Sequence, residues 1–448
     1  MTKYLSAKML FLGLLLCVSV SCKKDELINA ETPAEVVTPA EPAAPTPAPT
    51  VPTSPSSDVP ANATIYELGT GSGNLTIDGS TLKITNSALI KVKSGSYKTI
   101  TIKNITGSAA KPVFIKNNGQ VSVTGSMAID NVTYLTVSGD FTSGITYGFK
   151  FENISFRAVT VNGKMNYLTL KAMSFTKVGD YVIAGERSNG NDLNYSGSAD
   201  TRTEGFKVLN CLFDNAGAIS FGGNLNKDTG EDNGLFKDVE IANNIFQNTS
   251  AGTLCSFTNV QDYNIHHNVV NNVNSSNNDH NGIFFMQGNG KFHDNKLTNY
   301  QGNSIRMWLY SRGSTPATNE IYNNVCYNTR KYGAFELQAF DRNMYPGKTT
   351  YANAKVYNNT AGKMNTSRDW EGQLLDLYNT GGSLEYYNNL GFDLYSTKSV
   401  GNMINNMSDT KISKDSNNKY VPSQQDAVMD LTNFVSKITG VGESGLTF

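Results

Sequence analysis

The second half of the chain repeats a short pattern of apolar and polar positions. Each repeat places an apolar or aromatic residue three positions before a fixed asparagine, as in Ile241-Ala-Asn-Asn-Ile-Phe and Phe292-His-Asp-Asn-Lys-Leu. Short apolar strands with one turn residue per repeat are typical of a β-solenoid, in which each repeat forms one coil. The fixed asparagines are Asn244, Asn268, Asn295, Asn324, Asn359 and Asn389.

Stacking of the coils explains why asparagine recurs at this position. Its amide can hydrogen-bond the asparagine of the next coil, and asparagine tolerates left-handed backbone angles in tight turns. The spacing ranges from 24 residues between Asn244 and Asn268 to 35 between Asn324 and Asn359, because insertions can loop out at a corner. Several coils carry a second asparagine four residues later: Asn248, Asn272, Asn299 and Asn328.

A second strand is predicted after a glycine in most coils. Apolar residues occupy its first and third positions, as in Ile305-Arg-Met-Trp and Phe335-Glu-Leu-Gln. These side chains are expected to point inward, and the second and fourth to point outward and be exposed. Alignment of the coils gives one outward column of Ser220, Phe285, Arg306, Glu336 and Asp376, and a second of Gly222, Gln287, Trp308, Gln338 and Tyr378.

The first half of the chain repeats less regularly but also predicts strands. Segments such as Lys98-Thr-Ile-Thr-Ile-Lys and Tyr134-Leu-Thr-Val-Ser alternate polar and apolar residues. We therefore expect an all-β solenoid domain over residues 61–410. Residues 411–448 lose the repeat, and we expect a C-terminal cap there that hides the last open edge, with Ala427 to Lys437 forming a short helix or an irregular segment.

The chain begins with a predicted targeting segment, residues 1–21, in which two lysines precede the apolar stretch from Met9 to Val20. Ser19-Val-Ser-Cys resembles the cleavage box of bacterial lipoproteins, which implies that Cys22 is the lipidated first residue of the mature protein. Lys23-Lys-Asp-Glu resembles the surface-export signal of Bacteroidota lipoproteins. Together they predict anchoring in the bacterial outer membrane through Cys22, with display at the cell surface. The proline-rich residues 22–60 are predicted to be an extended linker.

Composition narrows the classes of function. The 448-residue chain has a formal net charge of -1, which argues against a general nucleic-acid binder, since such proteins are usually strongly basic. Cys211, Cys255 and Cys326 fall at different places in the repeat, so we expect free, buried thiols rather than disulfides. We also expect a monomer.

The two outward columns carry the strongest functional signal in the sequence. Trp308 and Tyr378 could stack on sugar rings, while Arg306, Glu336 and Asp376 could bond to sugar hydroxyls. The amides of Gln287 and Gln338 would add to such a site. The alternative is that Arg306 and Glu336 form only a cross-coil ion pair within a charge ladder.

Basic residues gather near these columns. Residues 291–348 contain eight Lys and Arg against four Asp and Glu, a local charge of +4. This excess favours an anionic ligand such as a uronate-containing or sulfated polysaccharide, with Arg312 and Arg342 as further binding residues. The alternative is that these charges decorate several faces of the solenoid.

Two segments of the first half, Gly95-Ser-Tyr-Lys-Thr-Ile-Thr-Ile-Lys and Lys111-Pro-Val-Phe-Ile-Lys, resemble the opening coils of the pectate-lyase-like superfamily. The similarity is greatest to its chondroitinase-B-like and alginate-lyase-like branch. This resemblance implies a right-handed parallel β-helix. The branch carries a catalytic lysine and arginine on neighbouring coils, for which Lys291 and Arg306 are the matches here. Bound Ca²⁺ is also plausible on this resemblance, although the sequence contains no calcium-loop motif.

All four histidines lie between His266 and His293. His266 and His293 share a column with Tyr322, Tyr357 and Tyr387, so we expect a stacked aromatic row rather than a zinc site. His280, just before Gly282, is the histidine expected beside the two outward columns.

Three hypotheses for function follow. In a polysaccharide lyase, Arg306 would neutralise a uronate carboxylate and a base would take the neighbouring proton, the candidate bases being Lys291, His280 and Arg312. In a glycosidase, Glu336 and Asp376 would act as a pair roughly 5 Å apart, with Asp341, Asp369 and Glu371 on neighbouring loops as alternative partners. The third hypothesis is a glycan-binding or adhesive lipoprotein without catalysis.

Overall fold

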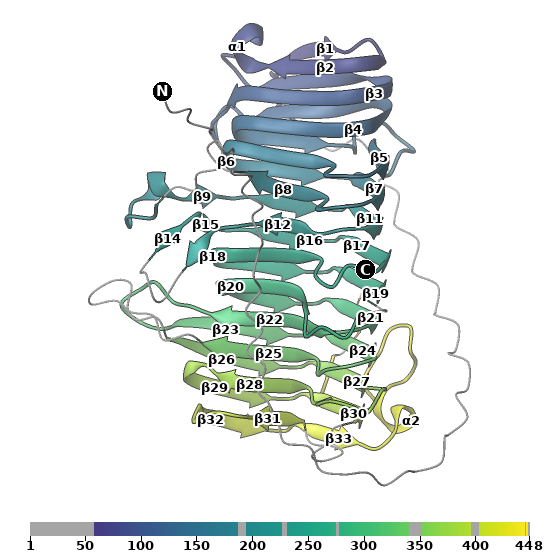
Figure 1. The fold of residues 1–448 in the computed structure, drawn as a ribbon, viewed down its shortest axis with the longest axis vertical. Helices are drawn as coiled ribbons and strands as arrows, with labels where there is room; N and C mark the ends of the chain where they lie inside the picture. The colour runs from purple at the N-terminus through teal and green to yellow at the C-terminus, as the bar shows by residue number, and fades with distance from the viewer. Residues whose placement is uncertain are drawn as a thin grey trace, which may run out of the picture. The chain divides into compact units, whose positions relative to one another are not determined.

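The computed structural model describes residues 58–186, 194–225, 231–274, 277–339, 351–395, 403–443 and 445–446, all within the compact unit Ala43–Phe448. Predictions for the leader, for lipidation of Cys22 and for most of the linker lie outside these residues. In the described part, parallel strands stack coil upon coil into an all-β, right-handed parallel β-helix, which confirms the predicted fold class (Figure 1). Among the described residues, no helix has the length and apolar character of a membrane span.

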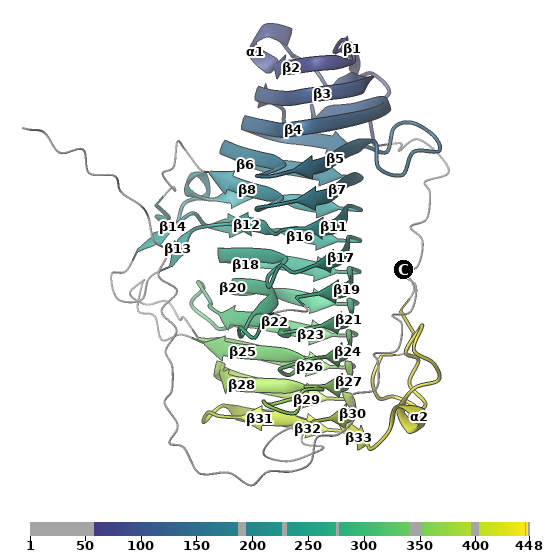
Figure 2. The same cartoon turned by 45° about the vertical axis from the view of Figure 1, so that its right-hand side comes forward.

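Three ladders of parallel strand pairs follow the coils, and we call them faces A, B and C (Figure 2). Face A contains β8 (Ile183–Glu186), β12 (Ile219–Phe221), β22 (Asn303–Leu309), β25 (Phe335–Ala339), β28 (Leu375–Asn379) and β31 (Ile404–Asn406). Face B contains β10 (Lys207–Leu209), β16 (Glu240–Ala242), β23 (Ala317–Tyr322), β26 (Ala352–Tyr357), β29 (Gly381–Tyr387) and β32 (Lys411–Ser416). Face C contains β5 (Phe149–Ile154), β7 (Met173–Val178), β11 (Leu212–Ala216), β17 (Ile245–Thr249), β19 (Val269–Val273), β21 (Lys296–Tyr300), β24 (Val325–Thr329), β27 (Thr360–Met364), β30 (Leu390–Leu394) and β33 (Lys419–Val421).

Longer strands pair on more than one face: β3 (Ala88–Thr106), β4 (Val113–Ser138), β6 (Val159–Lys171), β18 (Cys255–His266) and β20 (Gly282–His293). The remaining short elements of the solenoid are β1 (Thr64–Leu68), β2 (Ser72–Asp78), β9 (Thr203–Glu204), β15 (Phe236–Lys237), the helix α1 (Gly79–Leu82) and a 3₁₀ turn at Ala199–Thr201. An antiparallel hairpin of β13 (Asn224–Leu225) and β14 (Asp232–Asn233) projects from the coils.

The predicted asparagine ladder is present and buried between faces B and C. The backbone N–H of Asn268 donates to Oδ1 of Asn295 at 3.1 Å, and its side-chain Nδ2 donates to the same oxygen at 3.0 Å. The same two bonds join Asn295 to Asn324. The ladder runs beyond the predicted six residues, because Cys211 precedes it and Asn418 follows it.

Left-handed backbone angles occur one position earlier than the ladder itself. His267 and Asp294, which precede Asn268 and Asn295, have φ of 53° and 52°. The second asparagines do adopt such angles, for example Asn272 with φ of 55°. The ladder asparagines are therefore selected for their amide bonds, and the residues beside them for the sharp turn.

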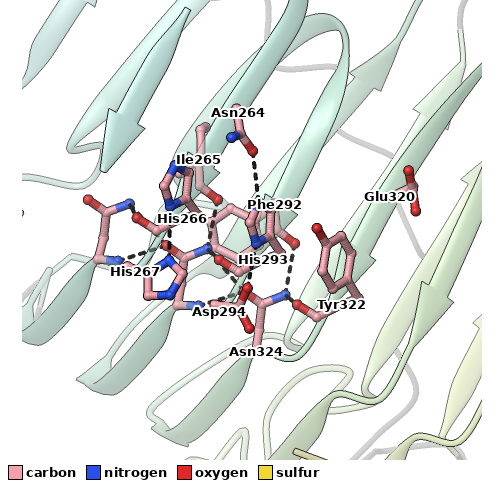
Figure 3. Close-up of polar contacts among 12 residues, drawn as sticks. Asn264, Ile265, His266, His267, Phe292, His293, Asp294, Glu320, Tyr322 and Asn324 are labelled. Atoms are coloured by element: carbon pink, nitrogen blue, oxygen red, sulfur yellow. Dashed lines mark hydrogen bonds and ion pairs between the residues drawn. The ribbon is translucent and has the colours of Figure 1, made fainter. Parts of the chain in front are cut away.

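The predicted aromatic row also forms along one column. The rings of His266 and His293 are 5.0 Å apart and nearly parallel, and those of His293 and Tyr322 are 4.6 Å apart (Figure 3). Tyr357 and Tyr387 continue the stack at 4.9 and 5.0 Å. These two histidines are thus part of a stacked side-chain row.

Apolar side chains from all three faces fill the interior. Phe151, Phe175, Phe213 and Phe246 stack on successive coils with ring centroids 4.5 to 5.0 Å apart. Each such ring contributes roughly 1.5 to 3 kcal/mol through burial. The three cysteines of the solenoid are free and buried, as predicted, and burial raises the pKa of Cys211 to about 12.

The C-terminal segment differs in part from the prediction. The repeat continues past residue 410, because β32 pairs with β29 and β33 with β30. The helix α2 spans Gln424–Ala427, and the rest of the segment to Lys437 is irregular, the second of the two predicted alternatives. Apolar residues from the end of α2 onward pack against Val325, Leu390 and Phe392: they are Ala427, Val428, Phe434 and Val441.

Candidate functional site

The predicted first outward column lies on face A. Strand pairing places Arg306 beside Glu336 and Glu336 beside Asp376 on successive coils, as the alignment indicated. The alignment missed one coil, because Ser256 lies between Ser220 and Phe285. It was also wrong at Tyr378, since an irregularity in the pairing places Asn379 next to Gln338.

The prediction that this column is exposed is wrong for its two carboxylates. Glu336 is 0% exposed and Asp376 is 4% exposed, while the side chain of Arg306 keeps 18% of its surface open. His280 lies against Glu336, with Nε2 2.9 Å from Oε2, and its own side chain is 26% exposed. The accessible polar groups are therefore Arg306 of the column and His280 beside it, and Glu336 lies beneath them.

Glu336 joins the two accessible groups. Its Oε1 accepts a hydrogen bond from Nε of Arg306 at 2.8 Å, and its Oε2 faces His280. Arg306 also donates through Nη1 to the carbonyl oxygen of His280 at 2.9 Å. Burial opposes ionisation of Glu336, but the hydrogen bond from His280 and the charge of Arg306 outweigh it and lower the pKa of Glu336.

The hydrogen bonds around His280 fix its tautomer. Nδ2 of Asn303 donates to the carbonyl oxygen of Gly333 at 3.1 Å, so Oδ1 of Asn303 faces Nε2 of His280, at 2.9 Å. Both neighbours of Nε2 are therefore acceptors, and Nε2 carries the proton. In the neutral ring Nδ1 then keeps its lone pair, and within the described ranges it hydrogen-bonds to no other group.

Asp376 behaves oppositely to Glu336. Burial, and then the negative charge of Glu336, raise the pKa of Asp376 to about 8. The contacts from Nδ2 of Asn303 and Asn405, at 3.4 and 3.5 Å, are long and only partly oppose this rise. At neutral pH the site therefore holds one ionised and one neutral carboxyl group on adjacent coils.

This raised pKa predicts a pH-dependent stability. The unfolded chain loses the Asp376 proton above about pH 4 and the folded chain only near pH 8, so the stabilisation is lost as pH rises between these values. Between pH 6 and 8, wild type should lose about 2 kcal/mol more of its unfolding free energy than Asp376→Asn. Urea unfolding at both pH values measures this difference, with Asp369→Asn as the control, because the pKa of Asp369 is lowered. The same pH dependence in Asp376→Asn and wild type would contradict it.

Aromatic rings surround the accessible groups. Trp308 contacts Phe285 edge-on at 4.8 Å, and the guanidinium carbon of Arg306 lies 5.8 Å from the Trp308 ring. On the other side, Tyr332 stacks on the ring of His280 at 4.3 Å and touches Trp370, which is 45% exposed. The site thus offers aromatic faces beside a cation.

Sequence alignment did not single out Asn303, Tyr332 and Trp370. A signal was present, because Tyr332 and Trp370 precede Gly333 and Gly372 at the same edge of face A where His280 precedes Gly282. These edge residues fold over the outward column, and so alternation along the strand does not reveal them.

Other candidate residues lie elsewhere. Lys291 is on the part of β20 that pairs on face B, where its Nζ is 3.1 Å from Glu320. Arg312 forms a buried bidentate pair with Asp232 and also bonds Asn259, so it fastens the hairpin of β13 and β14. Gln287, 6% exposed, donates to the carbonyl oxygen of Leu225 at 3.4 Å. Arg342 lies outside the described residues.

Among the described residues, the acidic and histidine side chains of the site are not arranged as a metal centre. Throughout the described ranges, no three or more His, Cys, Asp or Glu side chains are grouped so as to hold an ion. Ca²⁺ requires six to eight oxygen ligands. The two carboxyl groups of the site are instead bound by Arg306, His280 and asparagine amides.

Comparison with known proteins identifies similar solved structures only. No family and no curated protein matches the chain. A polysaccharide lyase of family PL6 from Pseudopedobacter saltans is 13% identical, with a TM-score of 0.44, over 84% of this chain and 99% of that one. A PL6 alginate lyase variant is 13% identical with a TM-score of 0.35, over 83% of this chain and 56% of that one. The catalytic domain of a GH87 α-1,3-glucanase in complex with nigerose is 14% identical with a TM-score of 0.34, over 75% of this chain and 68% of that one.

Proposed function

We propose that the protein binds an extracellular anionic polysaccharide and cleaves it by β-elimination. The observation that carries this proposal is that Arg306 and His280 both contact the carboxylate of Glu336, and that both side chains are partly exposed. A cation and a base on neighbouring coils are what elimination from a uronate requires. Of the candidate bases, His280 is the one that contacts both Arg306 and Glu336, whereas Lys291 lies on face B.

Arg306 has a donor to spare for the substrate. Its Nε and Nη1 are bonded to Glu336 and to the His280 carbonyl, while Nη2 donates to no group in the part of the chain that the structure describes. A guanidinium bound to a uronate carboxylate withdraws charge from it and makes the adjacent C–H more acidic. Nδ1 of His280 then takes that proton. The electron pair forms a C–C double bond, the glycosidic C–O bond breaks, and the leaving oxygen takes up a proton, which protonated His280 can return.

Glu336 is a positioning residue in this scheme. Its carboxylate holds the proton of His280 on Nε2 and stabilises the imidazolium that forms when Nδ1 is protonated. Its lowered pKa keeps it ionised for that role. Trp308 and Trp370 supply faces on which sugar rings can stack.

The hydrolase hypothesis has one specific observation in its favour, because the pKa values of Glu336 and Asp376 are shifted apart as in an acid–base pair. Both groups are nearly inaccessible, however, and His280 lies over Glu336. A glycosidic oxygen would have to displace His280 to reach them. This burial favours elimination over hydrolysis.

Anchoring and display remain part of the proposal. The leader and the cysteine box at Cys22 favour a lipid-anchored protein of the outer membrane, and the linker would hold the solenoid away from the lipid. At the cell surface the protein would act as a monomer, and its partner would be the polysaccharide.

The proposed function is tested with the full chain and a panel of anionic and neutral polysaccharides. Ultraviolet absorbance reports unsaturated uronate products, and reducing ends report every cleavage. We expect both signals with at least one polyuronate, and loss of both in Arg306→Ala. New reducing ends without absorbance would favour a hydrolase using Glu336 and Asp376. Retention of the protein by a glycan without any product would favour a binding protein.

A further inference from the structure

Two exposed aromatic rings lie on the N-terminal coils, far along the chain from the site. Phe156 is 61% exposed and Tyr181 is 40% exposed. They belong to the loops that precede β6 and β8, the strands that carry face A on these coils. Neither ring is needed to fill the interior, which is packed by the buried phenylalanines of the coils.

An arginine lies close to both rings. The guanidinium carbon of Arg157 is 5.1 Å from the Phe156 ring and 5.8 Å from the Tyr181 ring. Its Nε is 3.2 Å from Oδ2 of Asp180, which holds the side chain in place. Exposed rings that flank a fixed cation suit a ligand with both apolar sugar faces and carboxylates.

This platform, Phe156, Arg157 and Tyr181, lies on the same edge of face A as His280. Strand pairing links the coil of Val159 to that of Phe284 through Ile183, Ile219 and Cys255. The coil of Phe156 and Arg157 is therefore four coils from that of His280, and the coil of Tyr181 three, which is about 19 and 14 Å at the usual strand spacing.

The edge between the platform and His280 carries glycines. Gly217 and Gly252 precede the face A strands of the two intervening coils. At Gly217 an added Cβ would lie 2.0 Å from the Asp180 carbonyl oxygen, so this coil can present only backbone there. At Gly252 an added Cβ would lie 1.9 Å from Nδ2 of Asn281, so neither glycine has space for a side chain and both coils pack closely against their neighbours at this edge.

We propose that Phe156, Arg157 and Tyr181 form a second binding site for a uronate-containing polysaccharide, remote from His280 and serving the same polymer chain. The proposal rests on the proposed function for its ligand class. The rings would stack on sugar residues several units away from the one that reacts, and Arg157 would pair with a carboxylate. The site would therefore increase affinity for long chains and leave the chemical step unchanged.

The test is affinity electrophoresis of the full chain in gels that contain polygalacturonate, alginate or chondroitin sulfate, with dextran as the neutral probe. We expect Phe156→Ala/Tyr181→Ala to bind the anionic polymer that retards wild type about tenfold more weakly, because exposed aromatic anchors carry much of such binding. Arg157→Gln should weaken it similarly. Tyr351→Ala is the matched control, because it removes a ring of 42% exposure just before the face B strand β26. This variant should bind the polymer as tightly as wild type.

The outcomes separate the two proposals. Equal retention of wild type and the double variant, or no retention of wild type in any anionic gel, would overturn the second site. Weaker binding by the double variant than by wild type supports the second site. It does so even if wild type releases no product, because the absence of product would contradict only the proposed elimination. If product is released, the double variant should show a raised KM on polymer and an unchanged kcat on short oligosaccharides.

Discussion

Replacing His280 with alanine is expected to lower kcat for uronate elimination by about 10²- to 10⁴-fold, the usual contribution of a positioned general base. The reason is that, among the described residues, none of the other candidate bases contacts both Arg306 and Glu336 as His280 does. Initial rates of ultraviolet absorbance measure the loss. Circular dichroism and the melting temperature establish that the variant is folded.

Two further variants make this prediction specific. Glu336→Gln should also reduce kcat, because a glutamine amide would present a donor to His280 Nε2 and favour the wrong tautomer. Lys291→Ala removes the competing candidate base, which pairs with Glu320 on face B. If Lys291→Ala abolished activity and His280→Ala did not, the assignment of the base would be wrong.

The largest effect on stability is expected from the asparagine ladder. Asn295→Ala should lower the unfolding free energy by about 3 kcal/mol or more, because it leaves buried polar groups without partners at roughly 1 to 3 kcal/mol each. In wild type, Asn295 accepts from the backbone N–H of Asn268 and donates to the carbonyl oxygen of Ile265. The shift in the urea midpoint measures the effect.

Asn418→Ala is the matched control for the ladder. This residue ends the ladder and is only partly buried, so water can replace its bonds, and we expect a loss of about 1 kcal/mol. Equal losses at Asn295 and Asn418 would show that the buried bonds are not what stabilises the stack.

Repetition made much of this fold predictable. The ladder and the row of His266, His293 and the tyrosines followed from the sequence, because parallel coils place equivalent residues directly above one another. The neighbourhood of Arg306, Glu336 and Asp376 followed for the same reason. A polar coil such as Cys255-Ser-Phe-Thr gave a weaker pattern and was missed.

The rest depended on contacts that strand alternation does not encode. His280, from the loop before β20, lies against Glu336, and Tyr332, from the loop before β25, stacks on His280. The error at Tyr378 came from one irregular pairing between β25 and β28, which displaces every later position by one. The tautomer of His280 depends on Asn303, which lies on a neighbouring coil.

The central claim is that cleavage requires the substrate carboxylate, which Arg306 would neutralise so that His280 can remove the adjacent proton. The most direct test compares a cleaved polyuronate with the same polymer after chemical reduction of its carboxylates to alcohols. The account predicts ultraviolet absorbance and new reducing ends from the native polymer, and neither from the reduced one. New reducing ends from the carboxyl-reduced polymer, without absorbance, would contradict elimination and indicate hydrolysis.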